Sequence, residues 1–536
     1  MRAKACTRCR QLKLGCDADK QAPSACSRCR SLDHPCTFDP TFQRTSKTQQ
    51  LHELQEEVYR LQKALNKAQL SAATAGSSIQ PHPSHDPNTV ANLLQVPELS
   101  PYKTPRKVLG DLSLSEVEVT ELFRVFYDEC HIYLPFKING SSEALYHSCP
   151  LLFWAVCAVP APPAIRFKLE PQLKRMVSDV HLETPGSVEI VQALLILCMW
   201  PPSFSWNRHD PSFIYSGIAI HMGLQLGLHR PALANEFCLD VNALKVEPDS
   251  DTKKTTWLAC YIVSQMQVAR SGLPLPFPED SNLVIAFDDP KVSPQLSLLS
   301  HIYRLLGQSA NVIGAKGLSV SGLVDPITRV NMVMQFRAQF CTLWKRLLPY
   351  KCDMLELGFL SARLQLWSFV LHDDILLSAE VFDIINDAEQ DAMRLLQISS
   401  ETNLSFVPFY VRRSICYAAL MLVKLLKYPC IRSAHETIWE KIELARVSLS
   451  SSVDPSDGDV HHGIDRLLQA APYLETKETG PPTQSRMTYS MVFDFIRSYR
   501  RHYYRSDFGT LPTLGQEFFG IEHGVRPMEW SDIGPF

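Results

Sequence analysis

Residues 6–36 read CTRCRQLKLGCDADKQAPSACSRCRSLDHPC, with six cysteines in the spacing C-x2-C-x6-C-x9-C-x2-C-x6-C. The stretch consists of two near-copies of one unit, residues 6–16 and residues 26–36. Two thiolates that lie two residues apart can both bind one ion, whereas thiols that serve only packing do not repeat in this way. The repeat therefore indicates a metal site, and this site decides how the N-terminal part of the chain folds.

The number of cysteines narrows the kind of metal site. Tetrahedral zinc takes four ligands, so two zinc ions need eight ligand positions, and six sulfurs fill them only if two of them bridge both ions. His34 is the only histidine nearby. Two alternatives remain open, a pair of disulfide-rich loops and one four-cysteine site with two spare thiols. The opening residues MRAKACTRCR do not form a secretory signal, and disulfides are rare in reducing compartments, which disfavours the loops.

The repeat resembles the fungal zinc binuclear cluster, Zn(II)2Cys6, the DNA-binding module of the galactose and leucine-biosynthesis regulators. The resemblance implies two Zn2+ ions per chain, held within residues 1–40. Each half would form a short helix that carries its CxxC, and a pseudo-twofold axis would relate the halves. The implied ligands are Cys6 and Cys26 as bridges, Cys9 and Cys16 on one zinc, and Cys29 and Cys36 on the other.

The same resemblance implies a mode of DNA recognition. In the family the first helix enters the major groove and reads a CGG triplet, largely through a lysine between the second and third cysteines. Lys13 occupies that position here. Family members often carry further basic residues in this segment, but Arg10 and Lys13 are its only charges in this chain. We therefore expect the phosphates to be held by Arg10 together with Arg8, Arg28 and Arg30.

The charge of the chain is unevenly distributed. The net charge of −3 combines residues 1–50, which hold ten Lys and Arg against four Asp and Glu, with a part after residue 70 that holds 40 basic and 49 acidic residues. A basic head on an acidic body is typical of a protein whose head contacts nucleic acid. The 536 residues, 45% of them hydrophobic, suffice for two or more domains with a large core.

A membrane protein is not expected, because no apolar run reaches 18 residues without a proline or a charge. We therefore expect a soluble, intracellular protein, and as a DNA-binding regulator it would work in the nucleus. Ten cysteines lie outside the repeat, and their apolar surroundings without CxxC spacing indicate packed thiols. Examples are Cys157, Cys198 and Cys260.

A heptad repeat follows the cysteine repeat, after a polar linker over residues 41–50. In residues 51–70 apolar side chains fall at positions a and d, with Glu, Arg and Lys on the other faces, which predicts a short parallel coiled coil and a homodimer. Fewer than three heptads are marginal alone, so an amphipathic helix packed on the body is the alternative. The expected dimerisation residues are Leu51, Leu54, Val58, Leu61 and Leu65.

The remainder divides into a linker and a large domain. Proline-rich residues 71–112 predict a disordered linker. Structure is expected to resume at Ser113, where S-L-S-E resembles a capping box, and residues 113–505 are predicted to form one all-helical domain. The helices predicted within it include residues 187–200, 211–228, 251–272, 328–347, 358–382, 384–397 and 410–427.

Segments spread over residues 122–280 also resemble the fungal transcription factor regulatory domain, often called the middle homology region. The matching segments are LFRVFYDECHIYLPF, PLLFWAVCAV, VQALLILCMW, YSGIAIHMGLQLGLHRP, KKTTWLACYIV and SGLPLPF. The run WLACYIVSQ and the nine-residue loop between the two halves of the cysteine repeat resemble most closely the leucine-biosynthesis branch.

An enzyme is the competing class of function, and the sequence argues against it. A sulfur-saturated zinc cluster leaves no open position for water, and the chain shows no HExxH, nucleophile elbow, phosphate loop or Rossmann fingerprint. A metabolite-gated sensor or repressor, whose helical domain binds a small-molecule effector, is a second alternative. His221, His229 and Arg230 are candidates for lining such a pocket, although histidines on helices are usually packed.

Residues 506–536 interleave acidic and aromatic residues. From Gly509 on, four acidic residues oppose Arg526 alone, a composition typical of a disordered activation segment that contacts a coactivator. The alternative is an arm that packs Phe518, Phe519 and Trp530 onto the helical domain.

The sequence thus predicts a small two-zinc Zn(II)2Cys6 cluster and a short coiled coil, followed by a large all-α regulatory domain. The expected function is that of a dimeric transcription factor for RNA polymerase II genes. It would read CGG triplets in double-stranded DNA and activate one metabolic pathway or biosynthetic gene cluster.

Overall fold

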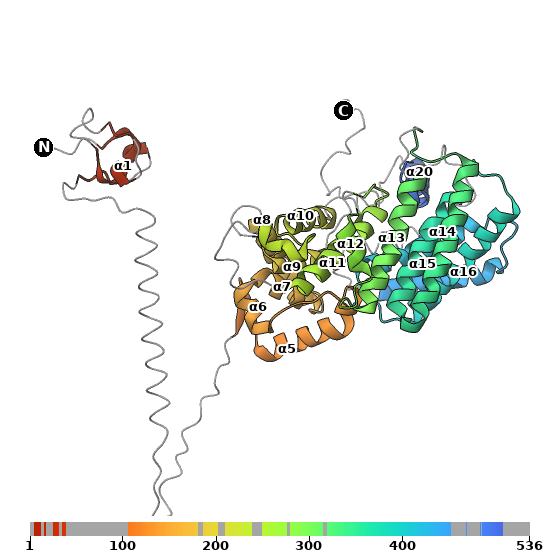
Figure 1. Cartoon of the computed structure of the whole chain (residues 1–536), viewed down its shortest axis with the longest axis horizontal. Helices are drawn as coiled ribbons and strands as arrows, with labels where there is room; N and C mark the ends of the chain where they lie inside the picture. The colour runs from red at the N-terminus through yellow and green to blue at the C-terminus, as the bar shows by residue number, and fades with distance from the viewer. Residues whose placement is uncertain are drawn as a thin grey trace, which may run out of the picture. The chain divides into compact units, whose positions relative to one another are not determined.

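The computed structural model of the chain contains two compact units, Met1–Ser100 and Pro101–Phe536, and each is described by itself (Figure 1). The predicted linker over residues 41–50, the coiled coil and the tail beyond Ser506 lie outside the described residues. The structure describes residues 5–11, 15–17, 25–31, 35–38, 106–180, 186–201, 210–237, 249–275, 279–314, 319–451, 468, 483 and 485–506.

The described residues of the first unit include two five-residue helices, each built on one CxxC. These are α1 (Thr7–Gln11) and α3 (Ser27–Ser31), and each begins directly after a cysteine, Cys6 or Cys26. The prediction of one short helix for each half of the cysteine repeat is confirmed. Helices this short cannot hold themselves together, so other bonds must fix them.

The second unit begins with a β-hairpin. β1 (Lys107–Leu109) pairs with β2 (Leu112–Leu114) in antiparallel register, with Val108 opposite Ser113. Gly110 has φ +56°, a conformation that glycine adopts without strain, and it lies in the turn between the strands.

The hairpin corrects the N-terminal boundary of the large domain, because residues 106–112 were assigned to the linker. The Lys107 side chain is buried, its amine pairs with the Glu143 carboxylate, and it lies 4.6 Å from the centroid of the Tyr146 ring. Leu112 and Leu114 are buried in the core. The large domain therefore includes residues 106–112, since these few residues contribute both a buried charge pair and apolar packing.

A capping box opens the first helix of the domain, α5 (Glu116–Val125), two residues later than the sequence suggested. The Glu118 N–H donates to the Ser115 hydroxyl (3.3 Å), and the Ser115 N–H donates to the Glu118 carboxylate (2.7 Å). Ser113 instead belongs to β2. Ser113 and Ser115 both fit the S/T-x-x-E pattern. Because Ser113 pairs with Val108 in the hairpin, Ser115 is the N-cap.

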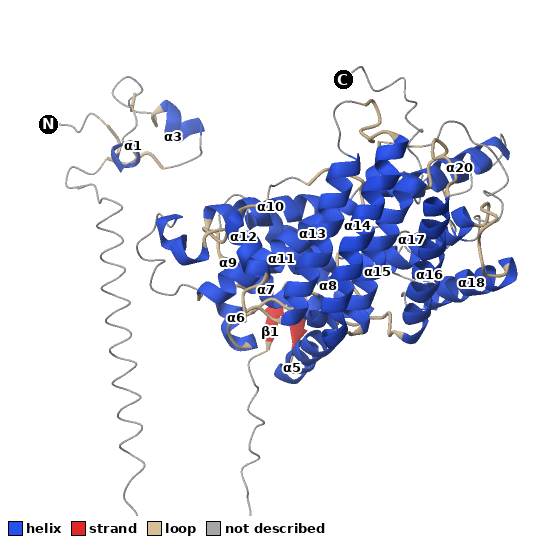
Figure 2. Cartoon of the chain, turned by 45° about the vertical axis from the view of Figure 1, so that its right-hand side comes forward, coloured by secondary structure: helices blue, strands red, loops and turns tan. Residues whose placement is uncertain are grey.

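The rest of the second unit is helical, which confirms the predicted all-α domain (Figure 2). None of the described helices is long and apolar enough to cross a membrane. The short turns are the π-turn η1 (Phe126–Cys130) and the 3-10 turns η2 (His131–Tyr133), η3 (Pro231–Phe237), η5 (Leu348–Tyr350), η6 (Ser368–Val370) and η7 (Met487–Tyr489). The helices are α6 (Ser142–Ser148), α7 (Pro150–Ala158), α8 (Pro163–Val180), α9 (Val188–Met199), α10 (Ser212–Gln225), α11 (Ser250–Ala269), α12 (Ser281–Phe287), α13 (Pro294–Gly314), α14 (Pro326–Leu347), α15 (Asp353–Trp367), α16 (Ala379–Glu401), α17 (Phe409–Leu425), α18 (His435–Ser451) and α20 (Ser490–Ser506).

Three helices, α7, α9 and α11, form the interior of the first half of the domain. Nearly every residue of α7 and α9 is buried, as is most of α11 from Thr255 to Val268. A helix that is apolar on all sides must be surrounded by other helices. Accordingly α9 packs against α7, α10 and α11, and α11 continues the packing to α13.

The second half of the domain extends this packing through α13, α15, α16 and α17 (Figure 2). One predicted boundary is wrong here, because residues 358–382 do not form one helix. α15 ends at Trp367, and α16 begins after Ser378, whose hydroxyl accepts from the Val381 N–H (3.4 Å). The apolar pattern runs through the break because the intervening turn η6 is itself buried.

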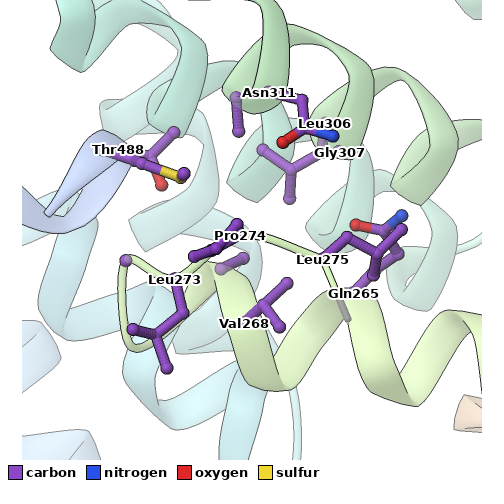
Figure 3. Close-up of a pocket in the computed structure, with 13 residues that line it drawn as sticks. Gln265, Val268, Leu273, Pro274, Leu275, Leu306, Gly307, Asn311 and Thr488 are labelled. Carbon is purple, nitrogen blue, oxygen red and sulfur yellow. The ribbon is translucent and has the colours of Figure 1, made fainter. Parts of the chain in front are cut away.

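The C-terminal turn η7 is inserted into the core beside α11, α13, α15 and α17. The Thr488 carbonyl accepts from the hydroxyls of Tyr417 (2.5 Å) and Ser368 (3.1 Å). Thr488 and Met487 also line a pocket between α11 and α13 whose empty space, including its open mouth, is about 310 Å³, and Figure 3 shows Thr488 at its edge. Met487 has φ +45°, so the buried turn holds a strained residue in place.

Gly272 allows the closest approach of this C-terminal segment. Its φ is +61°, and a Cβ at this position would lie 2.0 Å from the Arg486 carbonyl oxygen. Because the clash is with backbone, it cannot be relieved by rotating a side chain. Gly217 offers a matched contrast, since a Cβ there would meet no atom within 4 Å in the middle of α10.

We predict that Gly272→Ala destabilises the large domain by about 2 kcal/mol or more, because it adds a backbone clash to an unfavourable φ. Gly217→Ala should stabilise it by about 0.5 to 1 kcal/mol, since alanine is the better helix former. Thermal unfolding of both variants checks this prediction. Equal melting temperatures would contradict the close packing of the C-terminal segment on Gly272.

Candidate metal centre

The backbone of the two short helices directs N–H groups at the first sulfur of each half. The Cys9 N–H donates to Cys6 Sγ (3.5 Å), and the Cys29 N–H donates to Cys26 Sγ (3.4 Å). The C-x-x-C spacing causes this, because one helical turn returns the backbone to the sulfur three residues earlier. The two halves thus share one local geometry.

The last sulfur of each half is held in the same repeated way. The Cys6 N–H donates to Cys16 Sγ (3.4 Å), and the Cys26 N–H donates to Cys36 Sγ (3.4 Å). Equivalent bonds at a constant offset of 20 residues are what a pseudo-twofold relation between the halves requires.

The six sulfurs gather into two groups of four, and within each group the sulfurs lie within 4.8 Å of one another. Cys6 and Cys26 belong to both groups. Four sulfurs at about 2.3 Å from a tetrahedral zinc ion lie about 3.8 Å apart, and the measured separations agree with this. Cys6 Sγ lies 3.8 Å from Cys29 Sγ, and Cys9 Sγ lies 4.0 Å from Cys26 Sγ. The donor set therefore fits two zinc ions.

The hydrogen bonds at the shared sulfurs favour thiolates. The Cys29 N–H bond lowers the pKa of Cys26 to about 6. At Cys6, burial raises the pKa, but the hydrogen bonds from Cys9, Cys16 and Cys29 outweigh it and the pKa is lowered. Zinc binds the thiolate form, so these hydrogen bonds favour the state of Cys6 and Cys26 that binds a cation.

Two bonds between the halves are features that the sequence did not predict. The Ser27 N–H donates to the Asp17 carboxylate (2.9 Å), and the Thr7 N–H donates to the Thr37 carbonyl (2.9 Å). The Ser27 side-chain and backbone hydrogen bonds lower the pKa of Asp17. In each case the residue directly after the last cysteine of one half caps the helix of the other. The position of these two residues directly after the last cysteine of each half is the one sign of this link in the sequence. The residue type gives no further sign, because Thr37 accepts through its backbone carbonyl.

The structure describes the four arginines among the five candidate DNA-contact residues. Arg8 and Arg28 are exposed at equivalent positions of α1 and α3, and neither helix contains an acidic residue in its first turn. Arg30 is exposed and donates to the Ala25 carbonyl (3.1 Å), while Arg10 is half-buried. Lys13 and the five predicted dimerisation residues lie outside the described residues.

Of the three candidates for lining an effector pocket, His229 is accounted for by packing and Arg230 by an ion pair. The His229 ring lies 4.8 Å from the Phe237 ring, and Arg230 Nη1 is 3.0 Å from the Asp280 carboxylate. His221 is exposed. Cys157, Cys198 and Cys260 are buried, and burial raises the pKa of each thiol. Within the described parts of the chain, only the six cysteines of the repeat form a group suited to a metal ion.

Family comparisons agree with both units. Residues 4–45 match the fungal Zn(2)-Cys(6) binuclear cluster domain. Residues 124–295 match the fungal specific transcription factor domain, a range that contains the helices α6 to α12 described above. No solved structure matches the chain.

Curated relatives carry names of transcription regulators. The transcriptional regulatory protein SEF1 of Candida albicans is 26% identical over 528 residues, which cover 84% of this chain and 57% of the relative. The putative transcription factor SEF1 of Eremothecium gossypii is 27% identical over 73% of this chain and 39% of the relative. The regulatory protein LEU3 of Saccharomyces cerevisiae is 26% identical over 41% of this chain and 27% of the relative.

The chain spans less than two thirds of the length of each of these relatives. The family and the relatives are transcription factors and not enzymes, and they include the leucine regulator whose branch the sequence resembles. With residues 4–45 matching the zinc cluster domain and residues 124–295 matching the fungal specific transcription factor domain, the chain is similar to fungal Zn(2)-Cys(6) transcription factors in both of its units.

Proposed function

We propose that the chain is a nuclear, sequence-specific DNA-binding regulator of transcription that works as a homodimer. The observation that carries this proposal is the pair of arginine-bearing helices, α1 and α3, fixed by one shared group of sulfurs. Helices of five residues are stable only when such bonds hold them. The metal centre thus has a structural task, which is to present basic side chains to a nucleic acid.

In this proposal two Zn2+ ions occupy the two sulfur groups. Cys6 and Cys26 would be shared by both ions, Cys9 and Cys16 would complete one site, and Cys29 and Cys36 would complete the other. Every ligand position is sulfur, so zinc supplies stability and no catalysis. Six thiolates and two Zn2+ ions carry a net charge of about −2, which the surrounding arginines offset before they contact phosphate.

The DNA contacts are proposed from charge and exposure. Arg8 and Arg28, both exposed, with Arg10 and Arg30, would bind phosphates of the duplex. Lys13 would read the CGG triplet from the major groove, as the family resemblance implies. A base contact gives sequence discrimination, whereas phosphate contacts give affinity for any duplex.

Dimerisation and activation rest on parts of the chain outside the described residues. The heptad pattern of residues 51–70 supports a coiled coil, which would place two triplet readers on one DNA site. The acidic and aromatic composition of residues 506–536 supports a coactivator contact. We propose activation of one metabolic pathway or gene cluster, and a small-molecule effector acting through the helical domain as the alternative mode of control.

The first prediction from this proposal concerns the metal content of the full chain. The purified protein should contain two zinc ions, and a chelator should release them and abolish DNA binding. Cys6→Ala should lose both ions, whereas Cys36→Ala should retain about one, because only the former removes a shared sulfur. Elemental analysis of the three proteins decides this. Equal metal content in the two variants would rule out the shared cluster.

A second prediction separates base reading from phosphate contact. Lys13→Ala should weaken binding to a CGG-containing duplex by about 1 to 3 kcal/mol while leaving a scrambled duplex unchanged. Arg28→Ala should weaken both duplexes alike and lower the slope of log K against log salt by about 1. Fluorescence anisotropy at several salt concentrations measures both effects. A uniform loss in the Lys13 variant would contradict its role in recognition.

The third prediction tests the dimer. Leu54→Asp combined with Leu61→Asp should halve the molar mass in solution and retain the zinc, because charges at a and d positions disrupt the seam. His52→Asp with Tyr59→Asp adds the same charge at two b positions, on the outer face of the coiled coil, and should remain dimeric. Light scattering of the full chain gives both masses, and a dimer that persists in the leucine variant would refute the coiled coil.

A further inference from the structure

A polar cavity lies between α11, α13, α15, α17 and η7 in the large domain. The empty space among its side chains is about 400 Å³, including its open mouth. Residues distant in the sequence meet there, from Met266 to Tyr489. The lining consists of Met266, Ala269, Arg270, Tyr303, Ser361, Gln365, Tyr410, Arg413, Ser414, Tyr417 and Tyr489.

The lining carries two guanidinium groups, and among the described residues that form it there is no carboxylate. Arg270 is held by Asp210, with 2.6 Å between Nη1 and the carboxylate. Asp210 also accepts two hydrogen bonds from Ser212, so its carboxylate is already well occupied. Burial lowers the pKa of Arg270, the Asp210 carboxylate opposes this, and the nearby positive charge of Arg413 lowers the pKa further.

Hydroxyl donors complete this surface. The Tyr303 and Tyr410 rings pack edge to face, with 6.5 Å between their centroids and an angle of 87° between their planes. The Tyr410 hydroxyl is buried and has no hydrogen-bond partner in the described structure. A buried hydroxyl without a partner costs free energy, and an acceptor inside the cavity would recover it.

The adjacent cavity in Figure 3 provides a contrast. It shares Ala269 with the polar cavity, but its walls are mostly apolar, with Leu273, Pro274 and Leu306 among them, and they carry no charged side chain. Positive charge is therefore confined to one of the two neighbouring cavities.

We propose that the polar cavity binds a small oxyanion, a carboxylate or a phosphate, through Arg413, Arg270 and the Tyr410 hydroxyl. Guanidinium groups recognise these anions with parallel N–H donors, and tyrosine hydroxyls add directed hydrogen bonds. Tyr489 belongs to η7, so a bound anion contacts the C-terminal turn that fills the core. The site offers a means of control beyond DNA binding and is independent of the zinc cluster.

The test uses the full chain, with malonate and inorganic phosphate as probes. Either probe should raise the melting temperature at constant ionic strength, relative to chloride and to neutral malonamide, and calorimetry should give its Kd. The probe that binds more tightly identifies the anion as carboxylate or phosphate. If neither probe exceeds chloride, the proposal is overturned.

Variants distinguish a binding site from a structural network. Tyr410→Phe should weaken binding of the preferred probe at least about tenfold without lowering the melting temperature, because the hydroxyl has no partner to lose. Arg413→Gln should weaken it further. Tyr146→Phe, outside the cavity, is the matched control. If Tyr410→Phe and Tyr146→Phe bind the probe equally, the assignment is wrong, whatever the chain's affinity for DNA.

Discussion

Two sulfurs shared between two groups of four are the constraint on which the N-terminal unit depends. The two helices around them have five residues each, and few apolar side chains surround them. A unit of this size has too little surface to bury for a core of its own, so metal ligation takes the place of hydrophobic packing. The bonds from Asp17 and Thr37 then link the halves, so that both arginine-bearing helices move as one body.

The large domain contrasts with the N-terminal unit, because it has many apolar side chains to bury. Helices that are apolar on all sides, such as α9, must be enclosed, and the chain encloses them by successive helix packing. Polar groups are buried where the C-terminal turn η7 packs into the core, beside the cavity that contains Arg270 and Arg413. Burying polar groups costs free energy, so polar groups that stay in a core are candidates for a role in regulation as well as in stability.

The sequence was most informative where a pattern is local. The cysteine repeat and the bounds of α9 follow from spacing and from Ser187 and Pro201, because neighbours in sequence determine them. The short helix on each CxxC was expected from the family resemblance. The hairpin at Lys107 and the break after Trp367 were missed, because a distant partner such as Glu143 or a buried turn decides them. The polar cavity was beyond reach, since Arg270, Tyr410 and Tyr489 come together only in the folded chain.

X-ray absorption at the zinc edge of the full chain tests the central claim most directly. Two tetrahedral zinc ions that share two sulfurs cannot lie more than about 4.6 Å apart, twice the zinc–sulfur distance of about 2.3 Å. The account predicts four sulfur neighbours for each zinc and a zinc–zinc scattering contribution on the order of 3 Å. Four sulfurs without any zinc–zinc contribution, or nitrogen in the first shell, would contradict a cluster built on Cys6 and Cys26.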